Sequence, residues 1–301
     1  MPQQFSRVQS IFIAIGVTVI WSFSWVLIKF GLNDNIPPLL FAALRYSIAS
    51  LFLLMMVLRS KTERSQLMTI GKSELIRLIP LGLIYYAATQ GLQFLALDYL
   101  PAATYSLLLN FTSIAVMFGG VLFLSEIPTR LQIGAMLIFI AGVSLYFFPT
   151  PEISMIGLVV GIASVFSNAG SSLLGRAINR DAKRSALLVT TVTMGIGSGV
   201  LLIVALFLEG WQAISLTGWG IIVWLALVHT AFAFTLWNLT LQKLSATESS
   251  LINSTMLIQT AMLAWIFLGE SLSAKEVIAL IVALAGIIVF QMRSRSKQAS
   301  S

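Results

Sequence analysis

The chain contains no cysteine, a single histidine and few charged residues of either sign. The lack of cysteine excludes disulfides and thiolate metal sites. Charged residues make up only 10% of the 301 residues and hydrophobic residues 58%, which leaves no room for a sizeable soluble domain. A Gly-rich phosphate loop, a metal-ligand cluster, a nucleophile–base set and paired carboxylates are all missing. We therefore expect neither ATP-driven work nor catalysis, and no cofactor.

Long apolar stretches fill most of the chain instead. A helix needs about 20 mostly apolar residues to cross the hydrocarbon core, where lipid offers no partner to a free backbone group. The sequence predicts an all-α integral membrane protein with ten transmembrane helices, at Ile11–Phe30, Pro38–Leu58, Leu75–Leu97, Ala102–Leu124, Leu131–Phe148, Met155–Ala177, Ala186–Leu208, Trp219–Leu241, Ser249–Leu268 and Val277–Met292.

Basic residues are concentrated in every second gap between these stretches. Lys and Arg in short loops stay on the cytoplasmic side, so the pattern places both termini in the cytoplasm. One helix more or fewer would reverse every later loop and abolish the asymmetry, which supports the number ten. The same loops account for the net charge of +7, so we expect no nucleic-acid partner. The prediction is a multi-pass protein of a prokaryotic inner (plasma) membrane whose partners are the lipid bilayer and a small-molecule substrate.

An internal repeat links the two halves of the chain. Leu95–Val143 aligns without a gap on Leu239–Ile287 at an offset of 144 residues, which brings Glu126 onto Glu270. Five helices is an odd number, so the second copy must enter the membrane inverted relative to the first, as in many secondary transporters. Glu126 is then expected in a cytoplasmic turn and Glu270 in an outer one. The predicted repeats are residues 1–150 and 151–301.

Short motifs recur with this repeat, and together they resemble a known family. They are Trp21-Ser22, Pro37-Pro38 followed by Ala43-Leu44-Arg45-Tyr46, Pro101-Ala102, Phe123-Leu124-Ser125-Glu126, and Phe267-Leu268-Gly269-Glu270. The chain is similar over nearly its whole length to EamA-type members of the drug/metabolite transporter superfamily. The resemblance implies a ten-helix bundle of two inverted five-helix repeats that exports small metabolites such as amino acids. The second half has no clear counterpart of Arg45.

Polar side chains within the membrane usually face the bundle interior, so they indicate a pathway. They gather on the predicted third, fourth, eighth and ninth helices, with contributions from the first and sixth, whereas the fifth and tenth are nearly pure aliphatic and are expected to face lipid or a partner. Each could instead serve helix packing, because small polar residues allow close approach. The candidate substrate-binding residues are Trp21, Tyr85, Tyr86, Gln90, Gln93, Asn110, Asn168, His229, Trp237, Asn238 and Asn253.

Two titratable residues are candidates for proton coupling. His229, the only histidine, either relays protons, bonds a substrate, or is a satisfied packing residue. Glu248 lies in the first turn of the predicted ninth helix, where a carboxylate complements the helix dipole or takes part in coupling. Arg45 lies about two turns from the outer face, and we expect it to snorkel to the surface as an anchor.

The pattern favours a secondary transporter that works by alternating access. The middle of the third, fourth, eighth and ninth helices lacks Lys and Arg, which a phosphorylated substrate would require. Uncharged or zwitterionic solutes fit better, with export of amino acids as the most concrete form. The alternatives are an uptake permease for such solutes, an intramembrane enzyme and a structural membrane protein. Substrate identity, coupling ion and oligomeric state are left open by the sequence.

Overall fold

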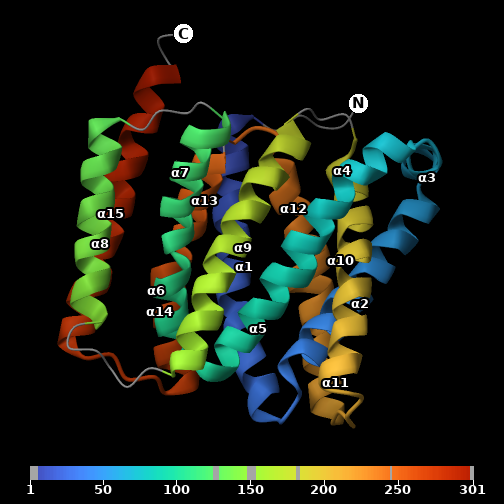
Figure 1. Cartoon of the computed structure of the whole chain (residues 1–301), viewed down its shortest axis with the longest axis horizontal. Coiled ribbons are helices and arrows are strands. Elements are labelled where there is room, and N and C mark those ends of the chain that lie inside the picture. The colour runs from blue at the N-terminus through green and yellow to red at the C-terminus, as the bar shows by residue number, and fades with distance from the viewer. Residues whose placement is uncertain (1–5, 125–128, 148–153, 181–183, 245, 299–301) are drawn as a thin grey trace.

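In the computed structural model the described residues are 6–124, 129–147, 154–180, 184–244 and 246–298, and all their regular secondary structure is helical (Figure 1). The first half begins with α1 (Arg7–Asn33) and α2 (Pro38–Arg59). A short α3 (Lys61–Met68), which the sequence did not predict, lies before the next crossing segment. That segment is continuous through α4 (Lys72–Gly82), the π-helix η1 (Leu83–Ala88) and α5 (Thr89–Tyr99), and is followed by α6 (Ala102–Leu109), α7 (Phe111–Leu124) and α8 (Arg130–Phe147).

The second half repeats this order. Its first two helices are α9 (Met155–Arg180) and α10 (Ala186–Leu208). A continuous segment follows, made of α11 (Leu216–Trp224), the π-helix η2 (Leu225–Phe232) and α12 (Ala233–Thr240). The last helices are α13 (Ala246–Ser254), α14 (Met256–Leu268) and α15 (Ala274–Gln298). Each of the predicted stretches thus coincides with one helix or with a series of consecutive helices.

The helices are interrupted at equivalent places in the two halves. A π-helix lies within the third segment of each half, and each fourth segment breaks at a single residue, Asn110 or Thr255. At both breaks the side chain competes with the helix for a backbone carbonyl. Asn110 Nδ2 donates to the Ser106 carbonyl over 2.7 Å, and Thr255 Oγ1 donates to the Ile252 carbonyl over 2.7 Å. The matching interruptions agree with a duplicated fold.

Within the described residues, six helical segments are long and apolar enough to cross a membrane, and three further apolar helices are shorter. The six are α1, α2, α4–η1–α5, α9, α10 and α11–η2–α12. The start of α1 and the C-terminal end of α15 lie at the same end of the bundle, the upper end in Figure 1, as an even number of crossings requires.

The helices α8 and α15 form a pair at one edge of the bundle, seen at the left of Figure 1. Their contact is close because each presents a glycine to the backbone of the other: Gly142 faces Ala283, and Gly286 faces Phe139. Small residues at helix contacts let backbones approach in membranes. A small hydrophobic cluster, separate from the main core, joins the pair to α6 and α14 through residues that include Leu107.

Carboxylates of the second half cap helices of the first half at the lower end of the bundle. Glu270 accepts hydrogen bonds from the backbone N–H groups of Ala102 (2.9 Å) and Ala103 (3.1 Å), at the start of α6. Glu209 binds the first turn of α2 in the same way, at 3.0 and 2.7 Å. Free N–H groups and the helix dipole favour a negative charge at these positions. Glu126, which the repeat aligns with Glu270, lies outside the described residues.

Ion pairs join the two halves at the upper end. The Arg184 guanidinium donates to both carboxylate oxygens of Glu74, at 2.7 Å each, and this pairing raises the pKa of Arg184. Arg7 at the start of α1 pairs with Glu248 in the first turn of α13. Both ends of the bundle therefore carry polar contacts between the halves.

Candidate functional site

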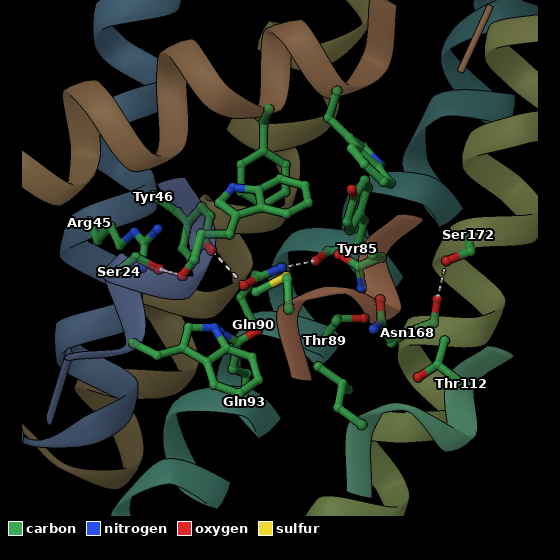
Figure 2. A pocket seen from close by; sticks show the side chains of 17 residues that line it. Ser24, Arg45, Tyr46, Tyr85, Thr89, Gln90, Gln93, Thr112, Asn168 and Ser172 are labelled. Atoms are coloured by element: carbon green, nitrogen blue, oxygen red, sulfur yellow. Dashed lines mark hydrogen bonds between the residues drawn. The ribbon is translucent and has the colours of Figure 1, made fainter. Parts of the chain in front are cut away.

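A cavity of about 60 Å³ lies between the two halves of the bundle. Among the described residues its lining comes from every crossing segment except α8, α10 and α15, so the fifth and tenth helices stand apart from it, as the sequence predicts. Figure 2 shows the side chains around it. Pockets for drug-sized ligands occupy about 300–1,000 Å³, so the helices must move before a metabolite fits here.

Most of the predicted site residues meet at this cavity. Those in its lining are Trp21, Tyr85, Gln90, Gln93, Asn168, Trp237 and Asn253. Asn110 lines an adjoining space of about 10 Å³, which shares Asn253 and Trp25 with the main cavity. Side chains that are far apart in sequence thus form one polar and aromatic surface.

The other three candidates take part in helix packing in this structure. Asn238 Nδ2 donates to Thr190 Oγ1 over 2.6 Å and so joins α12 to α10. His229 Nδ1 lies 2.7 Å from the Ile20 carbonyl, between η2 and α1. Tyr86 is fully buried, and its ring stacks on Tyr85 with 4.8 Å between centroids. None of the three lines the cavity.

Gln90 lies at the centre of a hydrogen-bonded chain in the cavity wall. Its Oε1 accepts from the Tyr46 hydroxyl at 2.5 Å, and its Nε2 donates to the Tyr85 carbonyl at 3.3 Å, as the dashed lines in Figure 2 mark. An amide can both donate and accept, so it can exchange these partners for polar groups of a solute.

Aromatic rings form much of the remaining wall. Trp21 packs against Phe234 and Trp237, with centroids 4.8 and 5.1 Å apart. Its indole N–H donates to the His229 carbonyl over 3.1 Å, which fixes the orientation of the ring. Such a wall has the chemistry to cover an apolar or aromatic group, and the neighbouring amides have the chemistry to hydrogen-bond a polar one.

Arg45 differs from its predicted role, because it does not snorkel to the surface. Only 2% of the residue is exposed, and it lines the cavity. The side chain points inward since η2 supplies hydrogen-bond acceptors: Arg45 Nε donates to Thr230 Oγ1 over 2.6 Å, and its Nη2 donates to the His229 carbonyl over 3.3 Å. The sequence argument considered cations only on the third, fourth, eighth and ninth helices, whereas Arg45 of α2 places one at the cavity. A charged residue within an apolar helix was the available sequence signal.

Glu248 is placed where the sequence predicts, in the first turn of α13, and it contributes there to the ion pair with Arg7. It is absent from the lining of the main cavity. Within the described residues, no group of three or more His, Asp or Glu side chains could hold a metal ion.

Comparison with known proteins identifies the family to which this chain belongs. The EamA-like transporter family model matches residues 8–148 and again residues 155–292. A probable amino-acid metabolite efflux pump of Salmonella typhimurium is 27% identical over 184 residues, which are 60% of this chain and 58% of the pump. The protein of the same description in Escherichia coli is 25% identical over 58% of this chain and 56% of that pump.

These matches therefore span little more than half the length of the two pumps. An uncharacterized Bacillus subtilis transporter, YvbV, is 25% identical over 71% of this chain and 68% of its own length. A crystal structure of another protein shares the fold, with a TM-score of 0.75 and 16% identity over 98% of this chain and 100% of that one. The chain belongs to the EamA-like transporter family, and its long apolar helices are those of a multi-pass membrane protein.

Proposed function

We propose that the protein exports amino acids or related small solutes across a prokaryotic inner membrane by alternating access. The observation that carries the proposal is the cavity between the two halves, which combines amide side chains with aromatic rings. In alternating access, related halves rock around such a site, so that it opens to one side at a time. Contacts between the halves at both ends of the bundle, such as Glu270 with α6 and Arg184 with Glu74, fit a closed intermediate.

The substrate class and the direction are supported by two relatives, both of which are described as probable amino-acid metabolite efflux pumps. The test is counterflow in proteoliposomes, screened over labelled amino acids, with pH and voltage gradients then imposed. Accumulation of at least one amino acid is expected. Net movement toward the cytoplasmic face under physiological gradients would favour the alternative of uptake, and an absence of counterflow for every amino acid would contradict the proposal. Proton coupling through His229 or Glu248 stays a prediction, which the imposed pH gradient examines.

Gln90→Leu is expected to weaken transport while leaving membrane insertion intact. Leucine fills roughly the same space but offers no hydrogen bond to a polar solute, and each such bond contributes about 0.5–1.5 kcal/mol. The expected result is a several-fold rise in the concentration for half-maximal counterflow. Leu137→Met, on an exposed part of α8, is the matched control and should change nothing. Unchanged transport by Gln90→Leu at equal protein levels would assign the amide to packing.

The proposed orientation predicts which positions are reached from the cytoplasm. The chain has no cysteine, so every introduced cysteine is a unique label. Cysteines at the exposed positions Ser65 and Lys243 should react only with reagents on the cytoplasmic side, and cysteines at the exposed positions Gln212 and Ser271 only with reagents outside. Ser65 and Gln212 lie between the second and third crossing segments of their respective halves, so labelling of Ser65→Cys and Gln212→Cys from the same side would contradict an inverted second half.

A further inference from the structure

We propose that Arg45 binds the carboxylate of the transported solute, and that the site recognises this carboxylate and not an amino group. The proposal rests on the proposed transport function and adds the charge that a substrate must carry. Arg45 is the only charged residue in the lining of the cavity as the structure describes it.

The guanidinium has no counter-ion among the described residues. Its two hydrogen bonds go to a neutral hydroxyl, Thr230 Oγ1, and to a neutral carbonyl, that of His229. Neither bond uses Nη1, so the N–H groups of Nη1 are left to donate to a ligand in the cavity that Arg45 lines. The Tyr46 and Phe94 rings lie 5.2 and 5.8 Å from its central carbon and supply only weak cation–π stabilisation. A buried charge without an ionic partner is costly, which points to a partner that arrives with the substrate.

The chemistry of the lining selects a carboxylate. A guanidinium presents a planar fork that matches the two oxygens of a carboxylate. The rest of the described lining is neutral, with amides such as Gln90 and Gln93 and the rings of Trp21 and Trp237. An ammonium group would find no acidic partner there, and a phosphate dianion would find a single cation. The best match is a monocarboxylate with an apolar or aromatic body, with or without an amino group.

The hydrogen-bond partners of Arg45 keep other hydrogen bonds when Arg45 is replaced by a neutral residue. The Thr230 hydroxyl still donates to the Leu225 carbonyl (2.9 Å), and the His229 carbonyl still accepts from Trp21 Nε1 (3.1 Å). An isolated buried charge costs free energy, and an apolar residue of similar length does not carry that cost. Arg45→Met should therefore fold, with an unfolding temperature at or above that of the wild type in the absence of solute.

The test measures protection of the purified protein against thermal unfolding by four probes that combine two groups: L-phenylalanine, phenylalaninamide, 3-phenylpropionate and 3-phenylpropionamide. We expect the two carboxylates to protect and the two amides to bind about tenfold to a hundredfold more weakly, since a hydrogen bond to a charged group carries that much affinity. Removal of the amino group should have little effect. In Arg45→Met the carboxylate preference should vanish, whereas Arg59→Met, an exposed position at the end of the same helix, should retain it.

Equal protection by acids and amides, protection that requires the amino group, or no protection by any probe would overturn the proposal. A markedly lower unfolding temperature of Arg45→Met without solute would overturn it too, because it would make Arg45 a structural tie between α2 and η2. The proposed transport function fails separately: counterflow of amino acids without a carboxylate preference at the site refutes only this inference, and protection by carboxylates without any counterflow refutes only transport.

Discussion

Replacing Gly142 by leucine is expected to force α8 away from α15 and to lower the stability of the protein by about 1–3 kcal/mol or more. A Cβ atom at this position would lie 2.5 Å from the Ala283 backbone nitrogen and 2.8 Å from the Ala279 carbonyl oxygen. Both are backbone atoms, which cannot turn aside as a flexible side chain would. The two helices must separate, and the small cluster beneath them loses its close packing.

Gly286→Leu should have an effect of similar size, because its Cβ would lie 2.6 Å from the Phe139 backbone nitrogen and 2.7 Å from the Ala135 carbonyl oxygen. Gly134→Leu is the matched control on α8, since nothing lies within 4 Å of a Cβ there. The measurement is thermal unfolding of each purified variant in detergent. Equal losses of stability in Gly134→Leu and Gly142→Leu would show that a large side chain is costly anywhere on α8, and that the close contact is not responsible.

The repeat explains why these two glycines behave as a pair. The sequence alignment places Gly142 on Gly286 at the offset of 144, but it does not say that the two helices touch. The similarity between the repeats can be found from the sequence, because aligning the chain with itself is enough to detect it. Contact between repeats depends on how the inverted halves are docked, which the structure alone supplies.

The crossing segments were predictable because the membrane imposes a simple length rule on apolar stretches. Their internal interruptions were not. The π-helices η1 and η2 are changes of backbone hydrogen bonding, and at the break the Thr255 side chain donates to the Ile252 carbonyl; neither feature alters the apolar pattern of the sequence. The short helix α3 escaped the same rule because it is polar and lies between crossing segments.

The site was predictable to the extent that polar residues cluster on helix faces. That argument selected Gln90, Gln93 and Asn168 as candidates, and the structure shows all three in the lining of one cavity. It could not separate them from Asn238, which has the same chemistry but meets Thr190 on a neighbouring helix. For Arg45 the one-dimensional argument considered only its distance from the helix end. The acceptors that hold its side chain inward come from η2, more than 180 residues later in the chain.

Glu270→Gln is expected to favour the state that is open at the end of the bundle where Glu270 lies, the outer end in the proposed topology. The wild-type carboxylate joins the loop after α14 to the first turn of α6, across the two halves. An amide offers one acceptor oxygen and no charge to these two N–H groups. Hydrogen bonds to charged groups contribute about 1.5–3 kcal/mol, and a loss of about 1.4 kcal/mol shifts a conformational equilibrium tenfold.

The shift can be followed by alkylation of a single cysteine in the cavity, Gln93→Cys, with an impermeant thiol reagent added outside. Glu270→Gln should raise the labelling rate about tenfold. Glu276→Gln is the matched control, because the hydrogen bonds that the structure shows to the Glu276 carboxylate come from Ser273, three residues earlier in the same half. A general loosening of the protein would also raise labelling, so a change at the opposite end is needed to distinguish the two explanations.

Arg184→Gln provides this change, since it removes the bidentate contact with Glu74 at the other end of the bundle. If the two sets of contacts hold opposite ends closed, this substitution favours the state that is open to the cytoplasm, and labelling of Gln93→Cys from outside should fall. Both substitutions weaken the structure, but alternating access requires that they change the labelling rate in opposite directions. A rise in outside labelling with Arg184→Gln would show that the contacts stabilise the fold in general and do not hold alternate gates.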